Sequence, residues 1–367
     1  MKKLTEIVIK QPEFQELLAQ AEGGHCPVAV SGLSGVHRAH IAAAMRQVTG
    51  CSVVLLCSDE QEGARLQADL AAFTGEPVRL LAGREFVFYD ATASRQWEHR
   101  RLDLLYAMSH EKAPLVVATM EGLLQRTLPP AALEQTALTL SLGDNCDLEQ
   151  LTRRLVAAGY ARCDQVEGPG QFALRGNLLD VFSPAAEAPV RTEFWGDEIE
   201  SIDEIDQVTG EVLNSYEALP IWPASHYVTA RPKMDKALGT IQDELRERLM
   251  QFKEEGKLLE AQRLEMRVNY DLEMLETMGF CSGIENYSRH LDGRAPGEPP
   301  YTLIDYFPKD FLCIIDESHV TVPQIRGMHE GDRSRKITLA EHGFRLPSCL
   351  DNRPLRFDEF EERIPQF

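Results

Sequence analysis

The sequence lacks several features that would assign it to a specialised class. None of its eight cysteines forms a C-x-x-C pair, so we expect buried free thiols in a reducing compartment and no metal site. The N-terminus has two lysines but no apolar signal core, and no window approaches about 18 uninterrupted apolar residues. We therefore expect a cytoplasmic protein that does not enter a membrane.

Basic residues are scarce relative to acidic ones. The 367 residues include 58 acids and 38 bases, a formal net charge of −20. This balance argues against a protein that coats nucleic acid nonspecifically, but it leaves room for a local groove or for an acidic face that meets a basic partner. The length, with 43% hydrophobic residues, predicts two or three soluble domains.

A working phosphate loop is also missing. In the pattern G-x-x-x-x-G-K-[ST], glycines let backbone N–H groups wrap phosphates, the lysine reaches the outer phosphates and the hydroxyl holds Mg²⁺. The one candidate segment begins at Gly32, has a further glycine at Gly35, and places His37, Arg38 and Ala39 where that pattern needs Gly, Lys and a hydroxyl. Arginine is no neutral substitute for lysine at a packed phosphate site, and alanine cannot ligate a metal.

The setting of this loop nevertheless resembles that of a nucleotide site. Val28–Val30 predicts a buried strand before it, and His40–Met45 predicts a helix after it. We favour a simple strand-to-helix turn whose glycines only turn the chain. The alternative is a degenerate cofactor site formed by Gly32, Gly35 and Arg38.

The string CIIDESHV carries the clearest chemical signal. Leu312–Ile315 predicts a buried strand, and Asp316 and Glu317 follow at its carboxyl end, where ligands of parallel sheets bind. There Asp316 could hold Mg²⁺ through water and Glu317 could orient an attacking water. The alternative is a solvated strand end. Without a matching phosphate loop, this Walker-B-like pair predicts poor ATP turnover.

The pattern of strands and helices divides the chain into three parts. Residues 1–132 alternate short β-branched strands with helical stretches, which predicts a parallel α/β sheet, and Leu128-Pro-Pro is predicted to be a linker. Residues 133–225 predict a small antiparallel α+β domain with one helix at Leu148–Ala158 and a hairpin turn at Gly196-Asp.

Residues 226–367 are predicted to hold two helices between Asp235 and Met278, interrupted at Gly256 and packed on the core. The strand into Asp316 completes the α/β domain. The final segment, FEERIPQF, has no helical cap or closing strand, so we expect the chain to be cut within a fold.

Long strings of residues show a resemblance to a known family. SGLSGVHRAH, ASRQWEHRRLDLL and VEGPGQFALRGNLLDVFSPAAEAPVRTEFWGDEIESI resemble the N-terminal module of the transcription-repair coupling factor, Mfd, and this likeness covers residues 1 to about 205. From about residue 208, VTGEVLNSYEALPIWPASHYVT and DESHVTVPQIRGMHEGDRSRKITLAEHGFRLPSCL resemble UvrB. The chain is similar to the UvrB-related proteins of bacterial nucleotide excision repair.

The resemblance implies a P-loop NTPase-like helicase domain with an inserted UvrA-binding domain. Mfd-type modules lack a working Walker A, in agreement with the degraded loop. UvrB's damage-probing hairpin has no room between Trp97 and Val116, and a second ATPase domain would begin after Phe367. The resemblance therefore implies that ATP and Mg²⁺, although used in the family, are not required here.

The resemblance places the UvrA contact on Arg175, Arg191 and Trp195. Arg191, Glu193 and Trp195 recur at period two, so they share one face of a strand. Arginine and tryptophan dominate binding energy at many interfaces. The alternative is that Trp195 belongs to the core and the arginines are solvated.

The resemblance also implies a DNA path along Tyr287, Arg333, Arg335 and Lys336. The cations would attract phosphates and Tyr287 would offer an aromatic face. A solvated loop explains the same residues equally well. The sequence thus predicts a repair protein that binds UvrA, and possible DNA contact, with little ATPase activity; the alternative is an ATP-dependent helicase or translocase subunit.

Overall fold

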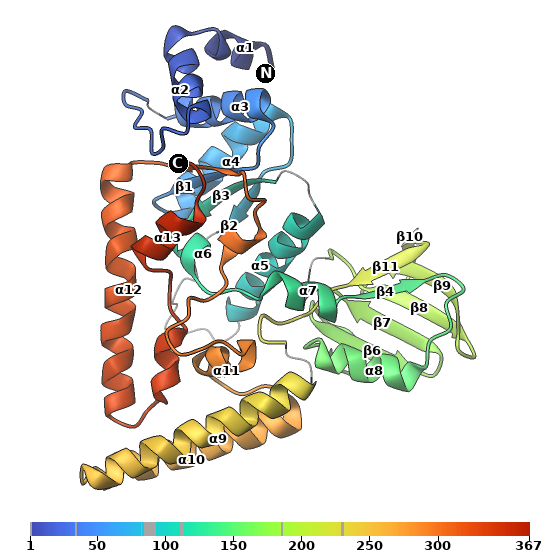
Figure 1. The fold of residues 1–367 in the computed structure, drawn as a ribbon. Coiled ribbons are helices and arrows are strands. Elements are labelled where there is room, and N and C mark those ends of the chain that lie inside the picture. The colour runs from blue at the N-terminus through green and yellow to red at the C-terminus, as the bar shows by residue number, and fades with distance from the viewer. Residues whose placement is uncertain are drawn as a thin grey trace.

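The computed structural model describes the chain except for residues 1, 34, 82, 84–92, 111–113, 185 and 229–230. Figure 1 shows three parts: an α/β part that holds both termini, a sheet-rich part beside it, and a pair of long helices at the opposite end from the N-terminus. The interval between Trp97 and Val116, where we predicted no room for a hairpin insertion, is occupied up to His110 by the helix α5 (Ala93–His110), and residues 111–113 lie outside the described residues.

The α/β part is built on a four-stranded parallel sheet in the order β12, β1, β3, β2. Its strands are Leu312–Ile315, Val53–Cys57, Leu115–Thr119 and Arg79–Leu81. Every residue of β1 and β3 is buried because both faces of a parallel sheet are covered by helices. The predicted parallel α/β class is confirmed.

Alternate residues of the central strands enter two separate apolar clusters. Val53, Leu55 and Cys57 face α3 and α4, whereas Val54 and Leu56 face the opposite side of the sheet. The first face is covered by α1 (Lys2–Ile9), α2 (Pro12–Glu22), α3 (His37–Thr49) and α4 (Glu60–Thr74). The second is covered by α5 (Ala93–His110), α6 (Met120–Leu124), α12 (Ser318–Glu341), α13 (Phe357–Arg363) and the 3₁₀ turn η2 (Leu303–Tyr306).

The predicted strand at Val28–Val30 is wrong. These residues belong to no strand of the described sheets, and two of the three are exposed. The Val28 N–H donates to the Phe367 carbonyl at 3.1 Å, so the segment runs beside the chain end rather than beside β12. An apolar run alone does not show whether a neighbouring strand is available for pairing.

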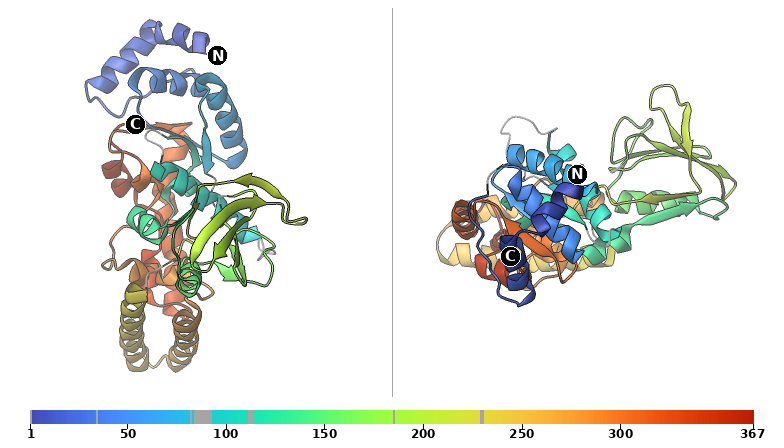
Figure 2. Two further views of the ribbon diagram at one scale, coloured as in Figure 1. Left: turned by 90° about the vertical axis from the view of Figure 1, so that its right-hand side faces the viewer. Right: turned by 90° about the horizontal axis from the view of Figure 1, so that it is seen from above.

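The sheet-rich part stands to one side of the α/β part (Figures 1 and 2). Its six-stranded sheet has the order β10, β9, β8, β7, β6, β5, and one face is covered by α8 (Leu148–Ala157). The strands are Ala161–Arg162 (β5), Gln171–Arg175 (β6), Leu178–Phe182 (β7), Val190–Trp195 (β8), Glu198–Ile205 (β9) and Val212–Ser215 (β10). The predicted hairpin at Gly196 is confirmed, but β5 runs parallel to β6.

Two chain crossings join this part to the α/β part. β4 (Leu138–Ser141) leads in and β11 (Ala218–Ile221) leads out, and they pair as a two-stranded antiparallel sheet. The predicted linker at Leu128-Pro-Pro is confirmed in part: Leu128 and Pro129 lie in neither a helix nor a strand, but α7 (Pro130–Thr136) begins at the second proline. Proline fits the first position of a helix, where its missing N–H would have no partner anyway.

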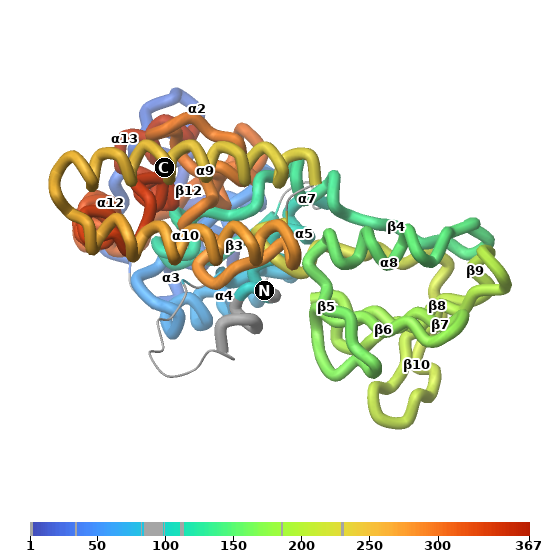
Figure 3. The backbone as a smooth tube through the Cα atoms, turned by 90° about the horizontal axis from the view of Figure 1, so that it is seen from below, coloured from blue at the N-terminus to red at the C-terminus, as the bar shows by residue number. Residues whose placement is uncertain are grey.

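The long helices are α9 (Arg231–Glu254) and α10 (Leu258–Met278), with a left-handed Gly256 between them. They were expected to pack on the main core, but they bury their apolar faces against each other. Their cluster also takes in η1 (Ile284–Tyr287), α11 (Ser288–Asp292) and Leu346, which precedes η3 (Pro347–Asp351). Figure 3 shows the pair lying side by side, apart from the six-stranded sheet.

The remaining sequence predictions concern cysteines and membrane spans. All eight cysteines are free thiols, as predicted, and Cys57, Cys281, Cys313 and Cys349 are buried. In the part of the chain that the structure describes, no helix is long and apolar enough to cross a bilayer.

Candidate partner-binding sheet face and degenerate nucleotide cleft

The outer face of the six-stranded sheet, opposite α8, carries the residues predicted to bind a partner. Buried residues of β8 alternate with Arg191, Glu193 and Trp195, so these three share the outer face as predicted. Arg191 lies directly across from Asp180 on β7, and Arg175 ends β6. The structure therefore brings the two arginines together around one aspartate.

Asp180 is the centre of this face, and its residue is only 4% exposed. The Arg191 Nε and Nη2 atoms donate to its two carboxylate oxygens at 2.7 and 2.9 Å, and Arg175 Nη2 donates at 2.6 Å. The hydrogen bond to Asp180 raises the pKa of Arg191 despite partial burial. Arg175, Arg191 and Asp180 form a triad in which two guanidinium groups share one carboxylate. The triad therefore keeps a net positive charge and a fixed geometry.

Trp195 lies at the end of β8, where the chain turns into β9. Its side chain is 77% exposed, so it does not belong to the core. Gly196 has a φ of +65°, which lets the hairpin turn directly after the indole. A large exposed aromatic group beside ordered arginines is the composition of a binding hot spot.

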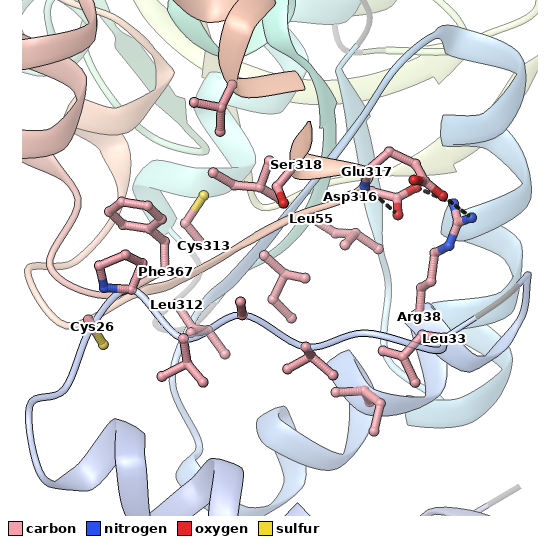
Figure 4. Close-up of a pocket in the computed structure, with 18 of the residues that line it drawn as sticks. Cys26, Leu33, Arg38, Leu55, Leu312, Cys313, Asp316, Glu317, Ser318 and Phe367 are labelled. Atoms are coloured by element: carbon pink, nitrogen blue, oxygen red, sulfur yellow. Dashed lines mark hydrogen bonds and ion pairs between the residues drawn. The ribbon is translucent and has the colours of Figure 1, made fainter. Parts of the chain in front are cut away.

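The second site is the cleft at the carboxyl end of β12, drawn in Figure 4. Asp316 and Glu317 emerge there, and Arg38, in the first turn of α3, reaches both carboxylates. Arg38 Nη1 contacts Asp316 and also donates to Glu62 Oε1 at 2.7 Å, while Nη2 donates to Glu317 Oε1 at 2.9 Å. One guanidinium thus joins three carboxylates, one from α4 and two from the connection between β12 and α12.

The charged groups in this cleft shift one another's pKa values. Burial and the nearby Glu62 carboxylate raise the pKa of Asp316, although Arg38 acts in the opposite direction. Burial opposes the charged form of Arg38, but the Asp316 and Glu62 carboxylates outweigh it and raise the pKa of the guanidinium. Arg38 therefore stays charged and holds the acidic pair in place.

The cleft does not fit a Mg²⁺–nucleotide complex. Arg38 contacts both carboxylates that would have to hold the metal and the attacking water. Ala39 is fully buried and supplies no hydroxyl, and Gly32 and Gly35 lie in a turn with no strand before it. Among the described residues, no group of three His, Cys, Asp or Glu could hold a metal ion.

A cavity of about 810 Å³ extends from this cleft along β12. It lies between residues 26–33 and the edge of the sheet, and Phe367 and the first turn of α12 close its ends. Apolar side chains form much of its wall, and the charged residues Arg38, Asp316, Glu317, Arg326 and Glu361 also line it. The cavity is therefore mixed in character, and Arg38 shares the cationic part of its lining with Arg326.

Comparison with known proteins supports the resemblance. Residues 138–227 match the model of the UvrB interaction domain, and residues 232–293 match the model of the UvrB third helical domain. "UvrABC system protein B" of Bacillus licheniformis is 52% identical over 76% of this chain and 42% of its own length. The protein of the same name from Caldicellulosiruptor bescii is 40% identical over 99% of this chain and 55% of its own length.

The chain is similar to UvrB over most of its length, and it contains segments that match two UvrB domains. It spans about half the length of the curated relatives it matches. The sheet with Arg175, Arg191 and Trp195 lies inside the UvrB interaction domain, and the helix pair α9 and α10 lies largely inside the UvrB third helical domain. The likeness of the first 205 residues to Mfd stays a prediction.

The predicted DNA path of this UvrB-like chain is only partly accessible. Tyr287 is 4% exposed in the helical cluster and donates its hydroxyl to Asp271 at 2.7 Å, so the expected aromatic face is wrong. Burial, followed by the Asp271 charge, raises the pKa of its hydroxyl. The ring stabilises the fold and cannot stack on a base.

The cations of the predicted path differ among themselves. Lys336 is buried, with its ammonium donating to Asp332 at 2.7 Å and to the Asn352 carbonyl, so it is unavailable to phosphates. Arg333 and Arg335 are exposed on α12, and Arg335 also pairs with Asp332 at 3.2 Å. Their role in DNA binding stays a prediction.

Sequence reasoning missed two carboxylates that organise these two sites. Asp180 precedes Val181 within an apolar strand, and an acid flanked by buried residues was the available signal. Glu62 lies in the first turn of α4, just after the helix cap Asp59, where acidic residues are common and indicate no special role. Neither pairing could be found without the strand register that places Asp180 opposite Arg191 and the packing that places α4 beside Arg38.

Proposed function

We propose that this chain is a nucleotide excision repair protein that binds UvrA through the outer face of its six-stranded sheet. The observation that carries the proposal is the exposed Trp195 on the same sheet face as two arginines that buried Asp180 fixes. The match to the UvrB interaction domain and the relatives named for the UvrABC system support UvrA as the partner. A carboxylate-bearing surface would complement the net positive triad.

Calorimetric titration with UvrA tests this proposal. Arg191→Glu and Trp195→Ala should each weaken binding by about 2 kcal/mol or more, as expected for interface hot spots. Arg246→Glu and Tyr270→Ala are matched controls, because both residues are exposed on the helix pair. Undiminished binding by the first two variants would exclude this face as the UvrA site.

We also propose that the α/β part is a P-loop NTPase-like domain with little or no ATPase activity. The support is Arg38, which occupies the position of the phosphate-loop lysine but is held by three carboxylates. The competing proposal is an ATP-dependent helicase or translocase subunit, supported by the placement of Asp316 and Glu317 at the end of β12.

Steady-state ATP hydrolysis with and without DNA distinguishes these proposals. The parent and Glu317→Gln should hydrolyse ATP equally slowly, because Glu317 has no metal-bound water to orient. DNA-stimulated hydrolysis that Glu317→Gln abolishes would establish the enzyme instead.

A further inference from the structure

The β10 strand forms an open edge of the six-stranded sheet. Among the described strands it pairs with β9 alone, and all four of its residues are exposed. A strand in this position leaves a row of backbone N–H and C=O groups without sheet partners. Figures 1 and 3 show β10 at the rim of the molecule, away from the α/β part and the helix pair.

Apolar side chains lie along this edge and at its turn. Val208 is 90% exposed, and Val212 and Leu213 are each more than half exposed. The turn is well ordered, because the Asp206 carboxylate accepts the N–H groups of Val208 and Thr209 at 2.9 and 2.7 Å. The apolar groups are therefore held outward by a defined hairpin, where leaving them in water is unfavourable.

The segment that contains this edge carries acidic residues and no basic ones. Residues 197–217 contain Asp197, Glu198, Glu200, Asp203, Glu204, Asp206, Glu211 and Glu217, and no lysine or arginine. Within the described part of the chain, none of these carboxylates lies within ion-pairing distance of a lysine or arginine. Hydrogen bonds from Asn214 and Tyr216 lower the pKa of Glu204, so this group stays ionised at neutral pH.

These charges decide which occupant the edge can accept. Pairing of β10 with the same strand of a second copy would bring two unneutralised acidic segments together, which is unfavourable. Nucleic acid is repelled for the same reason. A polypeptide rich in lysine or arginine would gain charge pairing, strand hydrogen bonds and apolar contacts together.

We propose that the β10 edge, with Val208, Val212 and Leu213, binds an extended basic polypeptide segment that joins the sheet as an additional strand. One strand, β9, separates this edge from β8, which carries Arg191 and Trp195, so the surface adjoins the proposed UvrA face without including its arginines. The inference does not depend on UvrA binding, and the basic segment can belong to a different partner.

Fluorescence anisotropy with a labelled peptide of alternating lysine and valine tests the proposal on the full chain. We expect saturable binding that weakens with salt, and no binding of the same peptide with glutamate in place of lysine. Methylating alternate backbone nitrogens of the probe should abolish binding, because only strand addition needs those N–H groups. If the methylated peptide bound as tightly as the unmethylated one, the binding would be nonspecific charge attraction, and the proposal would be overturned.

Paired variants locate the site. Val212→Ser with Leu213→Ser, and separately Glu211→Lys with Glu217→Lys, should each weaken peptide binding about tenfold. The matched controls on the helix pair, Leu258→Ser with Leu259→Ser and Glu247→Lys with Glu254→Lys, should leave it unchanged. Equal losses in the controls would contradict the proposal. Arg191→Glu should retain peptide binding, which separates this result from that of UvrA binding.

Discussion

At the scale of single residues, two buried carboxylates define the two sites in opposite ways. Asp180 holds Arg175 and Arg191 in an accessible arrangement, whereas Asp316 is held by Arg38 and is closed off from a metal. Both arrangements satisfy a buried charge, which would otherwise cost several kcal/mol. The same pairing chemistry therefore supports two proposals, a partner-binding face around Asp180 and a cleft with little ATPase activity around Asp316.

Asp180→Asn should weaken UvrA binding although Asp180 itself is buried. The neutral amide cannot balance two guanidinium groups, so Arg175 and Arg191 repel each other and lose their fixed positions. We expect about a tenfold loss of affinity in calorimetric titration, with near-native circular dichroism. Asp235→Asn, on the exposed surface of α9, is the control. Parent-like affinity would show that the arginines need no positioning.

Asp316→Asn should make the chain more stable at neutral pH. The pKa of Asp316 in the folded chain is raised above its ordinary value of 3.8, so ionisation favours the unfolded chain. The protonated Asp316 carboxyl contributes to the stability of the folded chain below pH 3.8, and this contribution is lost as the pH rises through the raised pKa. Urea denaturation should show a gain for the variant at pH 7 that disappears near pH 3.5. A loss of stability at pH 7 would show that the Arg38 pair outweighs burial.

At the scale of elements, the sequence predicted the strand β12 from its apolar run and the β8–β9 hairpin from the glycine at its turn. It also predicted a parallel α/β sheet and a separate antiparallel sheet, and, apart from the parallel strand β5, the structure contains both. The strand prediction at Val28–Val30 failed because this segment, although apolar, has no neighbouring strand with which to pair. Tyr287 and Lys336 were taken as surface groups because their burial depends on how α10 and η3 pack, which periodicity does not reveal.

The helix pair should be stabilised independently of the partner-binding sheet. Phe252 is completely buried between α9 and α10, so Phe252→Ala should cost about 3–5 kcal/mol in urea denaturation of that part. UvrA binding, measured below the unfolding transition, should be unchanged. Coupled loss of binding would mean that the helix pair supports or joins the interface. Met250→Ala, at an exposed position of α9, is the control.

At the scale of the whole molecule, separate parts carry separate tasks. The acidic chain presents its best binding groups on a sheet that stands apart from the α/β part (Figure 2). The α/β part has a parallel sheet with an acidic strand end, where Arg38 contacts Asp316 and Glu317. Given the functions proposed above, we interpret the molecule as an adaptor whose α/β part is NTPase-like.

Site-specific photocrosslinking tests this interpretation most directly. A benzoylphenylalanine placed at Glu193, between Arg191 and Trp195 on the outer face, should crosslink to UvrA without ATP. The same group at Tyr270, exposed on the helix pair, should not. No crosslink from position 193, or an equally strong one from position 270, would contradict the account.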